Sequence, residues 1–166
     1  MVEIIKATAT DLHQVRSIAF KTWPIAYKVI LSPEQMKYML DLFYSMDALR
    51  DQIEHLHHKF IIAFVNDEAI GFGSWSPKIT GSSTYRLHKL YVEPASQGKS
   101  FGKLLLGHIL IEITEAGGTD IELNVNRLNK AMYFYKREGF SIIREEDIDI
   151  GNGFFMNDFV MYKPIK

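Results

Sequence analysis

The stretch that decides the fold runs from residue 87 to residue 106 and reads LHKLYVEPASQGKSFGKLLL. Its first part, through Tyr91 and Val92, is an extended run. Pro94 ends that run, because proline lacks an amide hydrogen and disfavours helix at the residue before it. From Phe101 onward, apolar residues recur at helical spacing up to the glycine pair at 117–118. The sequence therefore predicts a strand, a short turn and a helix with a wide buried face.

The turn between that strand and helix, residues 97–102, contains two glycines and a lysine. The first N–H groups of a helix have no partner within the helix, and the helix dipole favours negative charge there. Glycine lets a ligand come close to the main chain, because no Cβ stands in the way. We therefore expect a phosphate or pyrophosphate group to bind at residues 97–102.

Three kinds of protein bind phosphates in this way, and the spacing of their glycines separates them. A nucleotide P-loop requires Gly-x4-Gly-Lys-Ser/Thr, a string that does not occur here. A dinucleotide fold requires Gly-x-Gly-x-x-Gly near the first strand, and both the third glycine and the early position are missing. Residues 97–102 instead resemble the pyrophosphate loop of the GNAT superfamily of N-acetyltransferases, written Gln/Arg-x-x-Gly-x-Gly/Ala. The one departure is Ser100, which stands where the family has glycine.

A second segment, residues 129–140 with the sequence NKAMYFYKREGF, is also similar to GNAT proteins. The positions that match the family pattern are Ala131, Phe134, Tyr135, Gly139 and Phe140. The resemblance implies that Asn129 contacts the pantetheine arm and that Tyr135 stands beside the thioester sulfur. The alternative interpretation makes Tyr135 a core aromatic residue whose hydroxyl is satisfied by the protein.

The resemblance implies acetyl-CoA as co-substrate, no metal, and Tyr135 as the catalytic acid. The cofactor-binding residues that it implies are Leu90, Tyr91, Val92, Gln97, Gly98, Lys99, Ser100, Phe101, Gly102, Lys103, Asn124 and Asn129. Because the chain has no cysteine and no serine in a nucleophile-elbow context, direct attack of an amine on the thioester is favoured over a covalent enzyme. Direct attack requires a base, for which His88, Glu122, Glu93 and a water molecule are all open. The histidines at 55, 57 and 58 lack nearby carboxylate or cysteine partners, so we interpret them as a polar helix end.

The remaining pattern predicts a single α+β domain, an N-acetyltransferase domain over residues 1–166. One helix is expected from Thr8 or Thr10 to the Trp23-Pro24 pair, and a second begins after Ser32. A third is expected to carry the chain to His58, and a fourth covers residues 129–138. Strands are expected at 2–6, 60–65, 70–75, 85–92, 121–125, 141–150 and 154–162, with Asn152-Gly153 as a tight turn. This order matches the GNAT arrangement. The resemblance therefore implies a mixed, mostly antiparallel central sheet that splays apart at the cofactor site and is flanked by helices.

The composition of the 166 residues is ordinary, with 47% apolar residues, 23% charged residues and a formal net charge of −1. That charge gives no argument for a nucleic-acid partner or an anionic membrane, since both favour basic surfaces. No apolar run approaches the ~20 residues of a membrane helix. The start of the chain, with Glu3 and only two isoleucines as an apolar core, is unlike a signal peptide, and we expect a cytoplasmic location.

The function predicted from these motifs is transfer of an acetyl group to a small-molecule amine. A polyamine-like acceptor is the first guess. Residues 154–161 resemble the last strand of the spermidine/spermine-type bacterial members, but that resemblance does not identify a substrate. The alternatives are a protein N-terminal or lysine acetyltransferase and, from another class, a catalytically idle acyl-CoA-binding module. The acidic run at 145–147 is read either as an attraction for a cationic acceptor or as a solvated strand edge. Residues 23–31 are expected in the acceptor wall, and a homodimer is left open.

Overall fold

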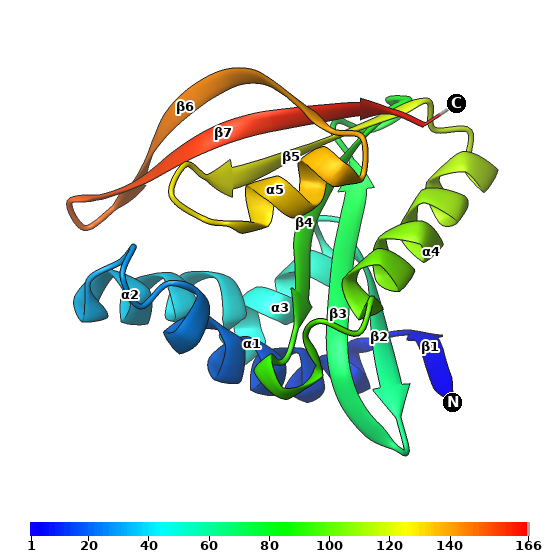
Figure 1. Ribbon diagram of the computed structural model, residues 1–166, viewed down its shortest axis with the longest axis horizontal. Helices are drawn as coiled ribbons and strands as arrows, with labels where there is room; N and C mark the ends of the chain where they lie inside the picture. Colours follow the sequence, from blue (N-terminus) through cyan, green and yellow to red (C-terminus); the bar gives the residue numbers. More distant parts are fainter. Residues whose placement is uncertain (166) are drawn as a thin grey trace.

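A computed structural model describes residues 1–165, and a seven-stranded sheet organises that part of the chain. The strand order is β1-β2-β3-β4-β5-β7-β6 (Figure 1). The bounds are β1 Val2–Lys6, β2 Lys59–Val65, β3 Glu68–Pro77, β4 Thr84–Val92, β5 Asp120–Asn126, β6 Ser141–Gly151 and β7 Phe154–Pro164. Every neighbouring pair is antiparallel except β4 and β5. The predicted mixed, mostly antiparallel sheet is confirmed.

The parallel pair of β4 and β5 ends early. Pairing runs only from Thr84 opposite Asp120 to Leu87 opposite Leu123, although β4 continues to Val92 and β5 to Asn126. The two strands therefore separate in the second half of β4, as the resemblance implied. Figure 1 shows β5, β7 and β6 turning away from the lower part of β4.

A β-bulge lies in β4 just where the two strands part. Ser74 of β3 pairs with Lys89 and Trp75 pairs with Leu87, so His88 has no partner on β3. An extra residue of this kind shifts the alternation of side chains by one position. Consequently Arg86 and Lys89, three positions apart, lie on the same face of the sheet.

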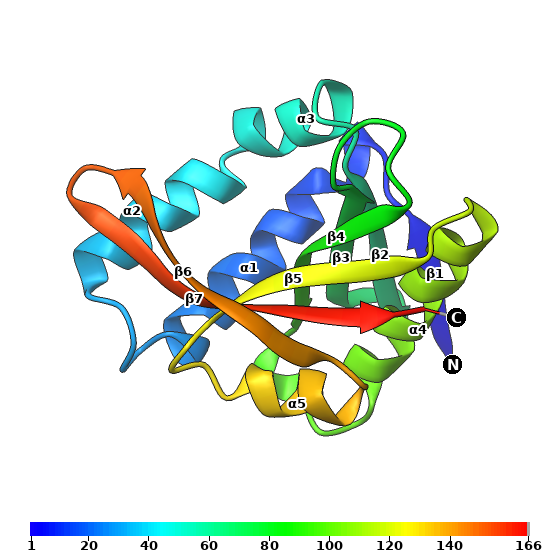
Figure 2. The ribbon, with the colours of Figure 1, turned by 90° about the horizontal axis from the view of Figure 1, so that it is seen from above.

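Two groups of helices cover the two faces (Figure 2). On one face lie α1 (Leu12–Ala26), α2 (Pro33–Tyr44) and α3 (Met46–Glu54), with the short 3₁₀ turn η1 (Ala9–Asp11) before them. On the other face lie α4 (Phe101–Glu115) and α5 (Ala131–Arg137), and η2 (Pro94–Ser96) connects β4 to the loop before α4. Each face has its own apolar core, as Phe72 shows on the α1 side and Trp75 on the α4 side. No helix within residues 1–165 is long and apolar enough to cross a membrane.

Two glycines of β3 allow α4 to lie close against the sheet. A Cβ at Gly73 would stand 2.7 Å from Cδ1 of Ile109, and one at Gly71 would stand 3.1 Å from Cδ1 of Leu105. Both distances are shorter than ordinary packing contacts, so larger residues here would push the helix outward. The close contact sets the position of α4, whose first turn follows the loop at the end of β4.

Three predicted helix ends are wrong by a few residues. The first helix passes through Pro24 and ends at Ala26, since Pro24 falls in the last turn and Trp23 packs on Tyr27 with 4.6 Å between ring centroids. The third helix ends at Glu54 rather than near residue 58, because His57 has a φ of 58°, which a right-handed helix does not allow. The helix predicted from residue 129 begins at Ala131.

Ser100 is the N-cap of α4 and has a left-handed backbone, with φ 65° and ψ 14°. The sequence left open whether this position requires positive φ, and the structure shows that it does. Its side chain makes no capping hydrogen bond. The serine therefore carries the steric cost of this conformation without a compensating contact.

We expect Ser100→Gly to increase the free energy of unfolding by about 1 kcal/mol, because glycine adopts positive φ without that cost. Urea unfolding measures the effect as a higher midpoint concentration, with the dependence of the unfolding free energy on urea (the m-value) unchanged. Ser100→Ala is the matched control, since it removes the same hydroxyl and keeps the strained backbone. Equal stability of the glycine and alanine variants would contradict the prediction.

Candidate functional site

The separated strands open into a cavity of about 380 Å³. Its walls come from α1, α2, α3 and β4 on one side and from β5, α5 and the β6–β7 hairpin on the other. Residues 23–31, expected in the acceptor wall, contribute Trp23, Tyr27 and Leu31. The cavity therefore extends from the unpaired edge of β4 to the helices α1, α2 and α3.

Main-chain groups of β4 face this opening. The N–H of Glu93 donates to the carbonyl oxygen of Ile70 on β3 at 2.8 Å. Successive residues of a strand direct their N–H and C=O groups to opposite sides, so those of Leu90 and Val92 point away from β3, toward the gap. The side chain of Gln97 confirms this direction, because its Nε2 donates to the carbonyl oxygen of Val92 at 3.0 Å. The N–H groups of Leu90 and Val92 are thus placed to hold an acyl carbonyl or an amide of an extended ligand.

The loop at residues 97–102 is open and carries positive charge. Gly98 has a φ of 79°, and no atom lies within 4 Å of the place where its Cβ would be. Lys99 and Lys103 are exposed and form no ion pair within residues 1–165. With the N-terminus of the fifteen-residue helix α4 beside them, these features fit the pyrophosphate of a coenzyme A.

Asn129 lies on the cavity wall and links α5 to α1. Its Oδ1 accepts from the N–H of Ala131 at 2.9 Å, and its Nδ2 donates to the hydroxyl of Tyr27 at 3.4 Å. The hydroxyls of Tyr27 and Tyr91 are 3.0 Å apart. Burial raises the pKa of both tyrosines, so both hydroxyls stay protonated at physiological pH.

Tyr135 has a packed ring and a hydroxyl that the protein leaves without a partner. The ring meets Phe134 and Phe140 edge-on, with centroid distances of 5.3 and 5.6 Å. Its hydroxyl forms no hydrogen bond with any other described residue, and the residue lines the cavity. Burial raises the pKa of Tyr135, which keeps the hydroxyl protonated. Tyr135 is therefore both a core aromatic residue and a donor available to a ligand.

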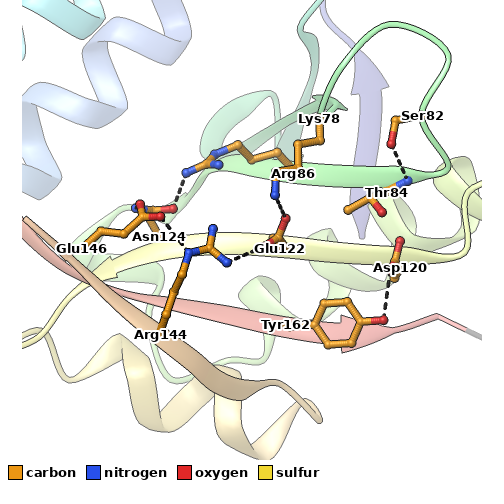
Figure 3. Close-up of polar contacts among 10 residues, drawn as sticks. All are labelled: Lys78, Ser82, Thr84, Arg86, Asp120, Glu122, Asn124, Arg144, Glu146 and Tyr162. Atoms are coloured by element: carbon orange, nitrogen blue, oxygen red, sulfur yellow. Dashed lines mark hydrogen bonds and ion pairs between the residues drawn. The ribbon is translucent and has the colours of Figure 1, made fainter. Parts of the chain in front are cut away.

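Asn124 lies within a polar network on the α1 side of the sheet (Figure 3). Its Oδ1 accepts from the guanidinium of Arg86, and its Nδ2 donates to Glu146 at 3.1 Å and to Asp158 at 3.2 Å. The acidic run is also engaged, since Glu146 pairs with Arg144 at 2.8 Å and Asp147 pairs with Arg127 at 2.6 Å. The structure thus groups Asn124 with these strands, and not with the loop at 97–102.

Of the three side chains considered as the base, only His88 lines the cavity. Glu122 is buried between Lys78 at 2.5 Å and Arg144 at 3.4 Å (Figure 3). Glu93 points elsewhere and accepts a hydrogen bond from Ser96 at 3.0 Å. Both carboxylates are therefore absent from the cavity wall.

His88 lines the cavity but is a poor proton acceptor. Its Nε2 is 2.7 Å from the hydroxyl of Ser76, and its ring stacks on His58 at a centroid distance of 3.8 Å. Burial, reinforced by the neighbouring positive charges, lowers the pKa of His88 to about 2. No group of three or more His, Cys, Asp or Glu side chains within residues 1–165 is placed to hold a metal ion.

The sequence reasoning missed three charged residues of the cavity, one of which is Arg86, whose bond to Asn124 is described above. The other two are Lys89 and Asp158, and Lys89 of β4 is the first of these. Its Nζ donates to Oε1 of Gln52 at 2.7 Å and stands 5.4 Å from the ring centroid of Tyr44. Only 8% of Lys89 is exposed, and burial lowers its pKa to about 7. A signal was present, because two consecutive polar residues, His88 and Lys89, interrupt an alternating strand and indicate a bulge.

The second missed residue is Asp158 of β7, which is 4% exposed. Its carboxylate accepts from Asn124, and it forms no ion pair within residues 1–165. Desolvation raises the pKa of this carboxyl group. Asp158 and Lys89 thus place one acidic and one basic group, neither of them in an ion pair within residues 1–165, on the walls of the same cavity.

Known proteins share this fold and these motifs. The family described as the acetyltransferase (GNAT) domain matches residues 30–158. A spermidine N(1)-acetyltransferase from Thermoplasma acidophilum is 30% identical over 160 residues, covering 93% of this chain and 95% of that protein. A [ribosomal protein bS18]-alanine N-acetyltransferase from Haemophilus influenzae is 29% identical over 90 residues, covering 54% and 56%.

Among solved structures, the PaiA N-acetyltransferase of Thermoplasma acidophilum in complex with coenzyme A superimposes with a TM-score of 0.83. That structure is 27% identical and covers 99% of both chains. The mixed sheet with separated strands agrees with this similarity of fold. This chain belongs to the GNAT family of acetyl-CoA-dependent N-acetyltransferases.

Proposed function

We propose that this enzyme acetylates a primary amine of a polyamine-like small molecule by direct attack on acetyl-CoA. The observation that carries the choice of acceptor is Asp158, a buried carboxyl group at the cavity wall that forms no ion pair within residues 1–165. A buried carboxylate is costly unless it is paired. An ammonium group of an aliphatic polyamine would remove that cost, since it brings the missing positive charge. The similarity to a spermidine N(1)-acetyltransferase supports the same class of acceptor.

The cavity walls support an acceptor with an aliphatic chain between its nitrogens. Trp23, Tyr27 and Phe43 present apolar surface to the cavity, and methylene groups bury favourably against such rings. The proposal treats residues 1–166 as one domain and retains a cytoplasmic location and a homodimer as expectations.

Acetyl-CoA supplies the activated acetyl group, and the chain holds and polarises it. In this proposal the cofactor-binding residues are Leu90, Tyr91, Val92, Gln97, Gly98, Lys99, Ser100, Phe101, Gly102, Lys103 and Asn129. The N–H groups of Leu90 and Val92 stabilise the oxyanion that develops on the carbonyl oxygen. Tyr135 delivers its proton to the departing thiolate. Asn124 is left out of this set, because its amide already bonds Arg86, Glu146 and Asp158.

An amine panel tests the acceptor. We expect release of free thiol from acetyl-CoA with aliphatic di- and polyamines, and a KM for them about tenfold higher in Asp158→Asn, a loss of about 1.4 kcal/mol. The KM for a monoamine of similar length should change little, because it lacks the second charge. Asp147→Asn is the matched control, since that carboxylate is exposed and already paired with Arg127.

Two other outcomes of the panel would overturn the proposal. Turnover of peptides with an N-terminal alanine, and none of polyamines, would favour protein acetylation. No thiol release with any amine, despite binding of coenzyme A, would favour an idle acyl-CoA-binding module.

Thermal melts with coenzyme A test the loop. At about 100 times its dissociation constant, coenzyme A should stabilise the wild type by ~2.7 kcal/mol, seen as a rise of several degrees in Tm. Gly102→Asp should abolish that rise, because it places a carboxylate at the phosphate site. The apo Tm should change little, since the added Cβ would stand 3.7 Å from the ring of Phe134, an ordinary contact. Gly107→Asp, on an open surface of the same helix, should keep the full response. A full response in Gly102→Asp would refute the loop assignment.

Kinetics of Tyr135→Phe test the proton donor. The variant keeps the packed ring and loses the hydroxyl, so kcat should fall by about 10²- to 10⁴-fold while the binding of acetyl-CoA and the Tm stay near the wild-type values. Tyr133→Phe on the exposed side of α5 is the control. Direct transfer also predicts no acetylated enzyme by intact-protein mass spectrometry when acetyl-CoA is supplied alone. A near-native kcat would leave Tyr135 as a core residue only.

A further inference from the structure

Lys89 is a buried amine on the cavity wall, next to a main-chain group that the proposed reaction uses. It directly precedes Leu90, whose N–H faces the gap between β4 and β5. Its side chain lies on the opposite sheet face from α4, among the helices that form the acceptor side of the cavity. The ammonium group is therefore on the side from which an amine approaches, one residue from the main-chain donor for the carbonyl.

We infer that Lys89 is the proton acceptor for the attacking amine, an inference that rests on the proposed acetyl transfer. The neutral acceptor nitrogen forms the C–N bond with the acetyl carbon, and the C–S bond breaks with its electron pair leaving on sulfur. The nitrogen gives one proton to the neutral Nζ of Lys89, directly or through one water, and the thiolate takes its proton from Tyr135. Solvent then removes the proton from Lys89 and returns one to Tyr135, so that charge and atoms balance.

The surroundings of Lys89 favour the neutral form that this role requires. No carboxylate forms an ion pair with it within residues 1–165. The polar and titratable groups that face it are Tyr44 of α2, Gln52 of α3, His58 before β2, and Arg86, His88 and Tyr91 of β4. None of these is an anion at neutral pH. Burial lowers the pKa of Lys89 to about 7, where a base is half deprotonated at physiological pH.

Gln52 acts as the positioning residue for this amine. Its Oε1 accepts from Lys89 at 2.7 Å, while its Nε2 donates to the carbonyl oxygen of Phe43 at 3.0 Å. The amide is thereby held at both ends and is 7% exposed. Because a neutral amide orients the amine without adding a charge, Gln52 leaves the low pKa of Lys89 in place.

Lys89 variants test the inference on the active enzyme with a polyamine acceptor. In the wild type, kcat/KM should rise with pH in two steps. The step near pH 7, the lower limb, reports deprotonation of Lys89, and a further rise toward pH ~10 reports deprotonation of the free acceptor amine. Lys89→Met should lower kcat by about 10²- to 10⁴-fold at pH 8 and remove the lower limb. Lys89→Arg should be equally impaired, since a guanidinium keeps its proton at every accessible pH. Melts with coenzyme A confirm that each variant is folded and binds.

Gln52→Glu provides a signed test that a merely structural role would not pass. A carboxylate 2.7 Å from Nζ favours the ammonium form, so the lower limb should move up by about 1 to 3 pH units. Activity should fall at pH 7 and recover above pH 9. Gln35→Glu is the matched control, because it adds the same charge to the cavity wall beside Phe155, where Gln35 now bonds the main chain. Its limb should stay near pH 7.

Three outcomes would overturn the inference. A native kcat in Lys89→Met would remove Lys89 from the proton path. Activity retained in Lys89→Arg and lost in Lys89→Met would make Lys89 a binding site for an anionic group of the acceptor. A lower limb unmoved by Gln52→Glu would assign it to another group. In each of these outcomes the wild type still transfers acetyl groups, so the proposed function is not affected. A wild type that acetylates no amine would refute the proposed function itself.

Discussion

The structure depends on the early separation of β4 from β5. Pairing ends at Leu87 and Leu123, and beyond this point the main-chain donors of Leu90 and Val92 have no strand beside them. An unpaired backbone group costs about 1–3 kcal/mol when it is shut away from water, so such a gap is stable only where solvent or a ligand reaches it. The packing of the rest of the chain maintains the gap. The helix α4 is held against β3 by Gly71 and Gly73, while β7 and β6 continue the sheet on the far side of β5.

The cavity that follows from this separation is lined by Arg86, Lys89 and Asp158, and Lys89 and Asp158 form no ion pair with each other. Each of these two has one neutral amide as its side-chain partner. Burying either charge without a counter-ion lowers the stability of the fold. Elsewhere on the same sheet face the charges are paired, as Glu122 is by Lys78 and Arg144. On this sheet face, charged residues in ion pairs, such as Glu122, hold strands together. Lys89 and Asp158, which form no ion pair among the described residues, remain available to a ligand.

Local chemistry explains which features the sequence predicts. The tight turn at Asn152-Gly153 and the helix after Ser32 follow from a few neighbouring residues, and both were expected from the sequence. The family of the cofactor loop also follows from glycine spacing. The strand separation came from the resemblance, because no local pattern encodes where β4 and β5 cease to pair.

The residues that the sequence did not reveal depend on contacts between distant segments. Lys89 faces the cavity only because a bulge at His88 shifts the alternation of β4. Asp158 becomes buried because β7 lies between β5 and β6. In the strand register, Asp158 stands opposite Asn126 of β5 and Glu146 of β6. Glu122, in contrast, is a plausible base from the sequence, but in the structure it is paired with Lys78, just after β3, and with Arg144 of β6. A one-residue change of register therefore decides which charged side chains belong to the site.

The two free charges also orient the proposed acceptor. In this proposal, a diamine that enters with both nitrogens protonated is attracted to Asp158 and repelled by Lys89, so its remote nitrogen lies near Asp158. Repulsion from the basic wall, and from its own remote charge, lowers the pKa of the nearer nitrogen. That nitrogen is then more often neutral, as direct attack requires, and it stands on the side of the cavity where Lys89 and the Leu90 N–H lie. On the proposed function, the asymmetry of the cavity would select one end of the acceptor for attack without a carboxylate base.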